Sequence, residues 1–137
     1  MTYLLDTTVY SQPLKRLPLE SVIRRWREVG DAACTVSVFC EMEVLQGIYM
    51  SGSERLQRLY STVLDGKLTL LDFTIKEAEI YARLQSQAVQ LGVTRPTIDL
   101  CIAATALRHG LILATLNAKD FTGIPGLQVE DWGEELN

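Results

Sequence analysis

Four acidic residues and one asparagine are spaced along this chain so that they could bind a hard cation together: Asp6, Glu43, Asp99, Asn117 and Asp120. Carboxylate oxygens are the protein ligands that Mg²⁺ and Mn²⁺ prefer. A cation of this kind offsets the negative charge that develops when a phosphodiester is cleaved, and it lowers the pKa of bound water. Carboxylates that share a pocket repel one another, so a bound cation stabilises such a pocket.

Each acid also has a purely structural alternative. Asp6 follows a short apolar segment, where aspartate often forms a turn. Asp99 could complement the dipole of a helix N-terminus. Glu43 could be a solvated helix residue like its neighbour Glu41, and Asp120 could cap a turn. The catalytic hypothesis therefore depends on whether the fold brings these side chains to one place.

The elements that would position them are short apolar segments alternating with amphipathic ones. Strands are predicted at residues 3–5, 32–36, 68–71, 111–114 and 127–129. Helices are predicted at residues 19–29, 38–47, 54–64, 74–91 and 97–108. Ser37 is expected to cap the second helix, and Thr74 with Glu77 forms a capping box for the fourth. This alternation predicts an α/β fold, with a central parallel sheet in a three-layer α/β/α sandwich. In such sheets the functional crevice lies at the carboxyl ends of the strands.

Length and composition limit the possible classes of protein. A chain of 137 residues with 47% hydrophobic residues fits one packed domain, residues 1–137. No apolar run is long enough to predict a membrane span. Cys34, Cys40 and Cys101 lie in apolar segments without the spacing of a zinc site, so we expect reduced thiols and a cytoplasmic protein. No catalytic role is predicted for His109.

The net charge of −4 argues against broad, passive nucleic-acid binding. It leaves room for a few local phosphate contacts, for which Arg24, Arg25 and Lys119 are the candidates. The pattern of Arg24, Arg25 and Arg27 favours a solvated helix face over an RNA-binding strip. Trp26 and Trp132 are expected to be packing residues.

Taken in order, the segments resemble the PIN-domain family, and in particular its VapC-type toxins. The resemblance covers nearly the whole chain, and it is carried by Leu4-Leu5-Asp6-Thr7, by Ser37 with Glu43, Leu45 and Gly47, by Asp99 with Ile102-Ala103-Ala104, by Thr115, Asn117 and Asp120-Phe121, and by the segment from Ile124 to Trp132.

This resemblance implies a Mg²⁺- or Mn²⁺-dependent ribonuclease that cleaves transfer or ribosomal RNA. It also implies a homodimer and inhibition by a cognate, VapB-like antitoxin. Asp6, Glu43 and Asp99 match the three core acids of the family. Asp6 and Asp99 are then the main metal ligands, and Glu43 binds the metal through water or orients the attacking water. Asp120 matches the fourth acidic region.

The chain departs from the family pattern at two positions. Thr8 stands where many members have asparagine, although its hydroxyl can still donate a hydrogen bond. Asn117 stands where many members have the fourth acid, so that role is divided between Asn117 and Asp120. The spacing to Gly47 favours Glu43 over Glu41 as the core glutamate.

Two other functions fit parts of this pattern. A haloacid-dehalogenase-like phosphatase also begins with a strand and a nucleophilic aspartate, but it usually carries a second aspartate where Thr8 stands here. A PIN-like domain without catalysis would act as a binding module, and loss of the core acids would be its signature.

Overall fold

The computed structural model describes residues 1–133, so residues 134–137 of the predicted domain 1–137 lie outside the described residues. Five strands of the described chain form one sheet in the order β3-β2-β1-β4-β5, and every neighbouring pair is parallel. The strands are β1 (Tyr3–Leu5), β2 (Cys34–Ser37), β3 (Thr69–Leu71), β4 (Ile112–Thr115) and β5 (Val129–Asp131). The predicted α/β fold with a parallel sheet is confirmed.

The strand order reverses direction between β1 and β4. From β1 the chain steps to β2 and β3 on one side, and it then returns to β4 and β5 on the other side. Leu5 is in register with Ala114, and the backbone N–H of Asp6 extends this pairing by donating to the Ala114 carbonyl at 2.9 Å. The carboxyl ends of β1 and β4 therefore meet at the switch point, where ligands bind in open α/β sheets.

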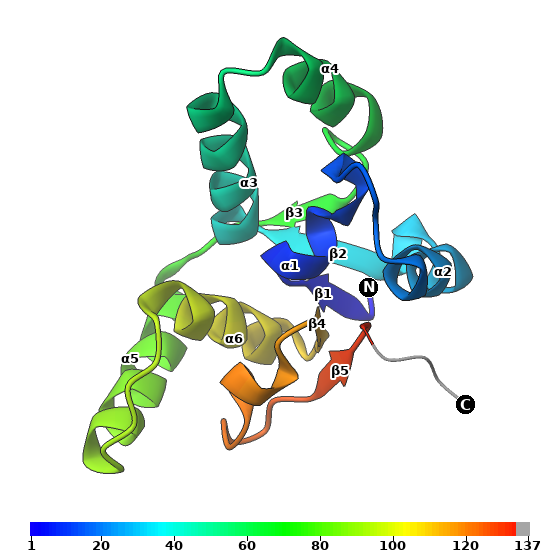
Figure 1. Ribbon diagram of the computed structural model, residues 1–137. Helices are drawn as coiled ribbons and strands as arrows, with labels where there is room; N and C mark the ends of the chain where they lie inside the picture. The colour runs from blue at the N-terminus through cyan, green and yellow to red at the C-terminus, as the bar shows by residue number, and fades with distance from the viewer. Residues whose placement is uncertain (134–137) are drawn as a thin grey trace.

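Helices flank the sheet, as Figure 1 shows: α5 and α6 pack together as a hairpin, whereas α3 and α4 are joined at one end and diverge. The helices are α1 (Thr7–Tyr10), α2 (Glu20–Val29), α3 (Val38–Ser51), α4 (Glu54–Val63), α5 (Ile75–Gln90) and α6 (Thr97–His109). Single 3₁₀ turns cover Gln12–Leu14, Asp31–Ala33 and Ala118–Phe121. Connections between parallel strands are almost always right-handed, so the β2–β3 and β3–β4 connections, which run in opposite directions along the sheet, are expected to place α3–α4 and α5–α6 on opposite faces.

The ends of the helices follow from local side chains. The Ser37 hydroxyl accepts a hydrogen bond from the Cys40 N–H at 3.2 Å and so caps α3, as predicted. Thr74 and Glu77 form the predicted capping box of α5. Gly110 ends α6 in the left-handed conformation with φ of 64°, which glycine adopts at little cost.

Several boundaries differ from the sequence prediction by a few residues, and one short helix was not predicted. The largest difference is in α3, which continues to Ser51, four residues beyond its predicted end. β2 begins at Cys34 because residues 31–33 form a 3₁₀ turn. β5 covers Val129–Asp131, two residues later than predicted, because Val129 is in register with Leu113 of β4. The short α1 was not predicted, since four residues are too few to show a helical period.

The centre of the molecule is apolar on both faces of the sheet. Leu4, Leu5, Leu113 and Ala114 have no exposed side-chain surface, which accounts for the unbroken apolar composition of β1 and β4. Trp132 is buried against Tyr3 in an edge-to-face contact at 5.4 Å, as expected of a packing residue. Within residues 1–133, no helix combines the length and the apolar character that crossing a membrane requires.

Candidate acidic site

Asp6 lies at the carboxyl end of β1, and it is buried although it carries a carboxylate. Its Oδ1 accepts a hydrogen bond from the Thr7 N–H at 2.8 Å, which caps α1. Its Oδ2 accepts from the hydroxyls of Thr115 at 2.7 Å and Thr8 at 3.2 Å. The carboxylate is thus held in one orientation by three donors from β4 and α1, as a preorganised ligand must be.

Thr8 connects Asp6 to the segment that follows β4. Besides donating to Asp6, its hydroxyl oxygen accepts a hydrogen bond from the Leu116 N–H at 3.1 Å. The Thr115 hydroxyl accepts from the Asn117 N–H at 3.0 Å. Threonine at position 8 therefore supplies the hydrogen bond to Asp6 that was expected of its hydroxyl.

Glu43 faces Asp6 from α3. Its Oε1 accepts a hydrogen bond from the Thr7 hydroxyl at 2.6 Å, so consecutive residues, Asp6 and Thr7, connect β1 to α3. Glu41 points to a different environment, where its carboxylate accepts from the hydroxyls of Tyr10, at 2.8 Å, and Tyr60. The structure thus separates the two glutamates, and Glu43 is the one that lies beside the Asp6 segment.

Asp99 lies in the first turn of α6, and its pKa is raised to about 6. Burial is the largest cause, followed by the negative charges of Asp6, Asp120 and Glu43, in that order. The positive charge of Arg95 acts in the opposite direction. The charges of three acids from three other segments therefore act on Asp99, and each of them raises its pKa.

Asn117 and Asp120 lie on the segment after β4. The Asp120 N–H donates to the Asn117 carbonyl at 2.9 Å and begins the 3₁₀ turn. Arg95 donates from Nη1 to the carbonyl of Asp120 and from Nη2 to that of Thr122. Both predicted residues thus border the acidic site, and the charge of Asp120 acts on Asp99.

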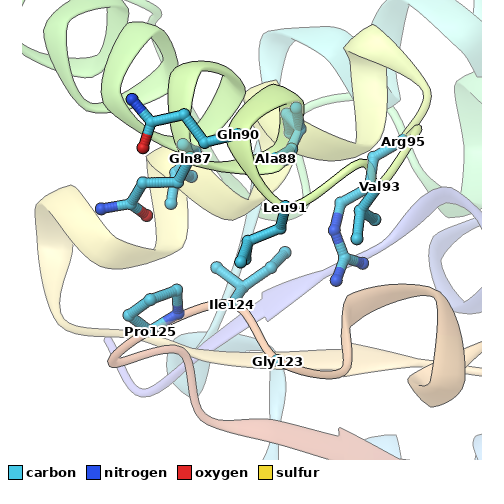
Figure 2. Close-up of a pocket in the computed structure, with 11 residues that line it drawn as sticks. Gln87, Ala88, Gln90, Leu91, Val93, Arg95, Gly123, Ile124 and Pro125 are labelled. Atoms are coloured by element: carbon cyan, nitrogen blue, oxygen red, sulfur yellow. The ribbon is translucent and has the colours of Figure 1, made fainter.

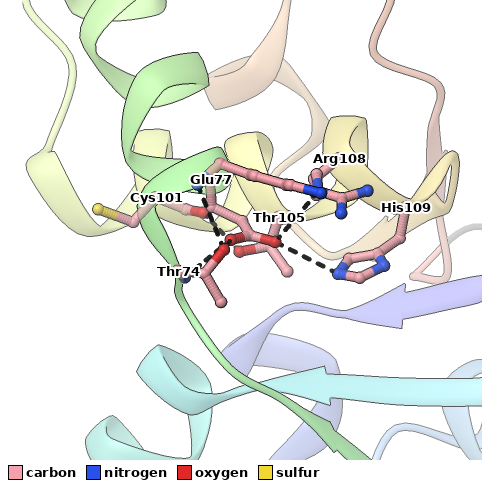
Figure 3. Close-up of polar contacts among 7 residues, drawn as sticks. Thr74, Glu77, Cys101, Thr105, Arg108 and His109 are labelled. Atoms are coloured by element: carbon pink, nitrogen blue, oxygen red, sulfur yellow. Dashed lines mark hydrogen bonds and ion pairs between the residues drawn. The ribbon is translucent and has the colours of Figure 1, made fainter.

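Two other predicted features lie apart from these acids. Arg25, a candidate phosphate contact, instead pairs with Glu130 at 2.9 Å and donates to the Tyr3 hydroxyl at 3.0 Å. We therefore correct its assignment to packing between α2 and β5. His109, for which no catalysis was predicted, lies 3.5 Å from Glu77 at the far end of α6 (Figure 3).

The cysteines are buried, and their thiols are poorly suited to nucleophilic chemistry. Burial raises the pKa of the Cys34 and Cys40 thiols to about 12, and it raises the pKa of Cys101 as well. The cysteine thiols are therefore poor candidates for a nucleophile, and the carboxylates are the better candidates for chemistry at this site.

Donor chemistry decides whether a divalent cation suits the acidic site. Among residues 1–133, no group of three or more histidine, cysteine, aspartate or glutamate side chains is arranged so that it could hold a metal ion. Mg²⁺ keeps several waters and needs only one or two carboxylates from the protein. The oriented carboxylate of Asp6 and the negative charges that raise the pKa of Asp99 fit a cation bound in this way.

Three residues of the site escaped the sequence analysis as functional candidates: Thr7, Thr115 and Arg95. Thr7 and Thr115 appeared only as members of motifs, and Arg95 was not singled out. Their partners are 36, 109 and at least 25 residues away in the sequence. Sequence periodicity and motif spacing do not predict hydrogen bonds between residues so far apart in the chain.

A model of the PIN domain matches residues 3–127 of the chain. The chain belongs to the PIN-domain family, as its motifs predicted. It is 34% identical over 107 residues to a ribonuclease named VapC1 from Rickettsia felis, a match that covers 77% of this chain and 80% of that protein. This family membership removes the phosphatase alternative.

Solved structures give the same result for the fold. The structure of FitAB bound to the IR36 DNA fragment matches with a TM-score of 0.89 and 25% identity, covering 99% of each chain. A toxin-antitoxin complex from Klebsiella pneumoniae matches with a TM-score of 0.71 and 25% identity, covering 98% of this chain and all of the matched one.

Proposed function

We propose that this protein is a divalent-metal-dependent endoribonuclease, the toxin of a toxin–antitoxin pair, which hydrolyses phosphodiester bonds in transfer or ribosomal RNA. The observation that carries the proposal is the convergence of Asp6, Glu43, Asp99 and Asp120 at the switch point of the sheet. The likeness to a relative named as a ribonuclease supports the choice of RNA.

Asp6 and Asp99 would hold the cation, Mg²⁺ or Mn²⁺. When bound, it supplies positive charge to the phosphate oxygens and acidity to a water molecule. The Thr115 and Thr8 hydroxyls orient the Asp6 carboxylate, and Arg95 counters part of the negative charge around Asp99.

Glu43 acts on the attacking water. The Thr7 hydroxyl fixes Oε1, which leaves Oε2 to orient the water and accept its proton. The bond from the water oxygen to phosphorus forms as the ester P–O bond breaks. The leaving oxygen takes a proton from solvent water, and Glu43 returns the proton that it accepted to solvent. Asn117 and Asp120 complete the polar border on the side of β4 and position the RNA strand.

Two protein partners belong to this proposal. The matched toxin–antitoxin complex supports a cognate, VapB-like antitoxin. A homodimer is proposed through the C-terminal half of α3, where Tyr49 and Met50 are 68% and 79% exposed. Burying such side chains against a second copy removes apolar surface from water. Sedimentation of the Tyr49→Glu variant tests this, and a wild-type monomer at micromolar concentration would refute it.

The activity is tested by incubating the purified chain with total transfer RNA or ribosomal RNA, with Mg²⁺, with Mn²⁺ or with a chelator. Asp6→Asn and Asp99→Asn should abolish cleavage and keep the fold. Asp72→Asn is the matched control, because Asp72 also follows a strand directly but is exposed at the edge strand β3. Full cleavage by Asp99→Asn, or undiminished cleavage in the chelator, would refute the assignment; absence of cleavage by the wild type would favour the binding module.

A further inference from the structure

Arg95 joins two segments that are distant in the sequence and that both carry candidate site residues. It lies in the connection between α5 and α6, four residues before Asp99. Its two terminal nitrogens each donate to a separate backbone carbonyl, those of Asp120 and Thr122. Figure 2 shows the Arg95 side chain extending from the α5–α6 connection toward the segment that contains Gly123.

The geometry of this contact is specific to arginine. The guanidinium group is planar and presents donors in a fixed fork, whereas a lysine ammonium is a point charge on a flexible chain. Two carbonyls two residues apart in one turn match the fork. A lysine would keep the positive charge, but it could not hold both carbonyls in the same plane.

The turn that Arg95 holds is anchored elsewhere by apolar packing. Phe121 is buried within the 3₁₀ turn, and Ile124 is buried just after it. Asp120 lies in the same turn, directly before Phe121, and its negative charge raises the pKa of Asp99. Packing fixes the apolar side of the turn, and Arg95 is the contact that ties its backbone to the start of α6.

We propose that Arg95 is a positioning residue, which holds the turn at residues 118–122 against the N-terminus of α6 and so fixes Asp120 relative to Asp99. The role rests on the proposed nuclease function only for its catalytic consequence. The structural part of the role, ordering of the turn at residues 118–122, does not depend on any reaction.

The rival role for Arg95 is direct contact with an RNA phosphate, and two variants distinguish the roles. A phosphate contact depends mainly on charge, so Arg95→Lys would keep most activity, and Arg95→Gln would raise KM. A positioning role depends on the fork, so both variants should lower kcat by a similar factor, roughly 10- to 100-fold, with a smaller change in KM. Arg83, exposed on α5, supplies the matched controls Arg83→Lys and Arg83→Gln.

Two readouts do not require catalysis. Amide hydrogen exchange should accelerate at residues 118–124 in both Arg95 variants, while exchange in the strands stays unchanged. Mn²⁺ titrated with the protein alone should bind Arg95→Gln no more weakly than the Arg83 controls, because Asp6 and Asp99 are the proposed ligands and the positive charge of Arg95 opposes the ion. Weaker Mn²⁺ binding would overturn the assignment of Arg95 to the turn and show that it acts on the metal ligands. If the wild type cleaves no RNA, the nuclease proposal fails, but hydrogen exchange still decides the positioning role.

A rescue experiment covers the case in which a variant loses stability. Millimolar guanidinium added to Arg95→Ala should restore protection of residues 118–124 and part of kcat, and equimolar ammonium should not. Wild-type exchange and kcat in Arg95→Lys would overturn the proposal, and so would equal rescue by the two cations.

Discussion

The hydroxyl of Thr7 donates a 2.6 Å hydrogen bond to Oε1 of Glu43, and this one contact connects the end of β1 to the middle of α3. The backbone N–H of Thr7 also donates to the side chain of Asp6, which caps α1. Thr7 therefore contacts both acids, Asp6 at the end of β1 and Glu43 on α3, and sets their relative position.

Thr7→Val removes this hydroxyl while keeping the shape of the side chain. We expect kcat for RNA cleavage to fall about tenfold, since a hydrogen bond to a charged group contributes roughly 1.5–3 kcal/mol. Thr7→Ser keeps the hydroxyl and should retain most activity. Steady-state kinetics at saturating Mg²⁺ check both, and equal activity of Thr7→Val and the wild type would show that Glu43 needs no positioning by Thr7.

Substitutions of Glu43 and Glu41 should affect different properties, catalysis in the first case and stability in the second. Glu43→Gln should lower kcat strongly with little loss of stability, because Glu43 acts on the attacking water in the proposed mechanism. Glu41→Ala leaves the Tyr10 and Tyr60 hydroxyls without their acceptor, and Tyr10 is 1% exposed. A buried donor without a partner costs about 1–3 kcal/mol.

Urea unfolding and kcat at a temperature where both proteins are folded separate these effects. The free energy of unfolding should fall only in Glu41→Ala, and kcat should fall chiefly in Glu43→Gln. The reverse pattern would make Glu41 the functional glutamate.

The sequence sufficed for those features that depend on local pattern. Short apolar strands, the Thr74–Glu77 capping box and the position of Asp6 directly after β1 follow from neighbouring residues. The family motifs named Asp6, Glu43 and Asp99 in advance, and the charges of Asp6 and Glu43 both raise the pKa of Asp99. Their roles as metal ligands stay predictions.

Features that depend on tertiary packing were out of reach. β1 pairs with β4 across more than one hundred residues, and that pairing is what brings Thr115 to Asp6. Arg25 belongs to an arginine-rich helix face that suggested RNA contacts, but its partner Glu130 is 105 residues away. Sequence spacing carries no information on such partners, so the ion pair could not be distinguished from a solvated charge.

The ion pair of Arg25 gives a stability prediction. Arg25 pairs with Glu130, donates to the Tyr3 hydroxyl and lies 5.8 Å from the centre of the Tyr3 ring. Arg25→Gln should lower the free energy of unfolding by about 1 kcal/mol, because these contacts are partly exposed. Arg27→Gln, on the exposed face of the same helix, is the control.

Salt titration of RNA binding completes this test. Arg25→Gln should leave the slope of RNA affinity against salt unchanged, because Arg25 makes no phosphate contact in our assignment. A slope reduced by about one would return Arg25 to the RNA surface. Arg24 and Lys119 stay the predicted phosphate contacts.

The raised pKa of Asp99 makes stability depend on pH. The ordinary value is 3.8 and the folded value is about 6, so between them the folded chain binds this proton more tightly than the unfolded chain. Stability without metal should therefore fall as pH rises through this range. Asp99→Asn removes the effect, and it should raise Tm at neutral pH but not below pH 3.8.

Bound metal should reverse the difference in Tm between the wild type and Asp99→Asn. Saturating Mn²⁺ stabilises a folded protein that binds it, so it should raise the Tm of the wild type and have little effect on Asp99→Asn. Asp72→Asn is again the control, with wild-type behaviour expected under both conditions. Identical Tm values for the wild type and Asp99→Asn at neutral pH without metal would show that Asp99 bears no repulsion.

The last prediction concerns the antitoxin. A pocket lined by Asp6, Glu43 and Asp99 can be blocked by a peptide that brings its own cation, and we expect an inserted arginine or lysine to pair with these acids. Apolar residues of the same peptide should cover the N-terminal half of α3, next to Glu43. Val38 and Met42 are exposed there, by 36% and 46%.

The structure shows which apolar side chains of α3 an antitoxin peptide could contact. The ring of Phe39, three residues before Met42 on α3, packs edge to face on Phe73 at 4.9 Å. Phe39 therefore supports the surface from below, and Met42 is the side chain that a peptide can reach. Met42→Glu should weaken antitoxin binding at least tenfold and leave RNA cleavage unchanged, and Met50→Glu is the matched control on the proposed dimer half of α3.

The salt dependence of binding should distinguish the RNA complex from the antitoxin complex. With a net charge of −4 and few phosphate contacts, RNA binding should weaken with added salt along a shallow slope. The antitoxin complex should resist salt better, because packing on Val38 and Met42 is not screened by ions. Fluorescence titrations of both complexes over the same salt series provide the comparison. If the antitoxin dissociates at moderate salt while RNA stays bound, inhibition rests on charge alone and the apolar surface of α3 has another partner.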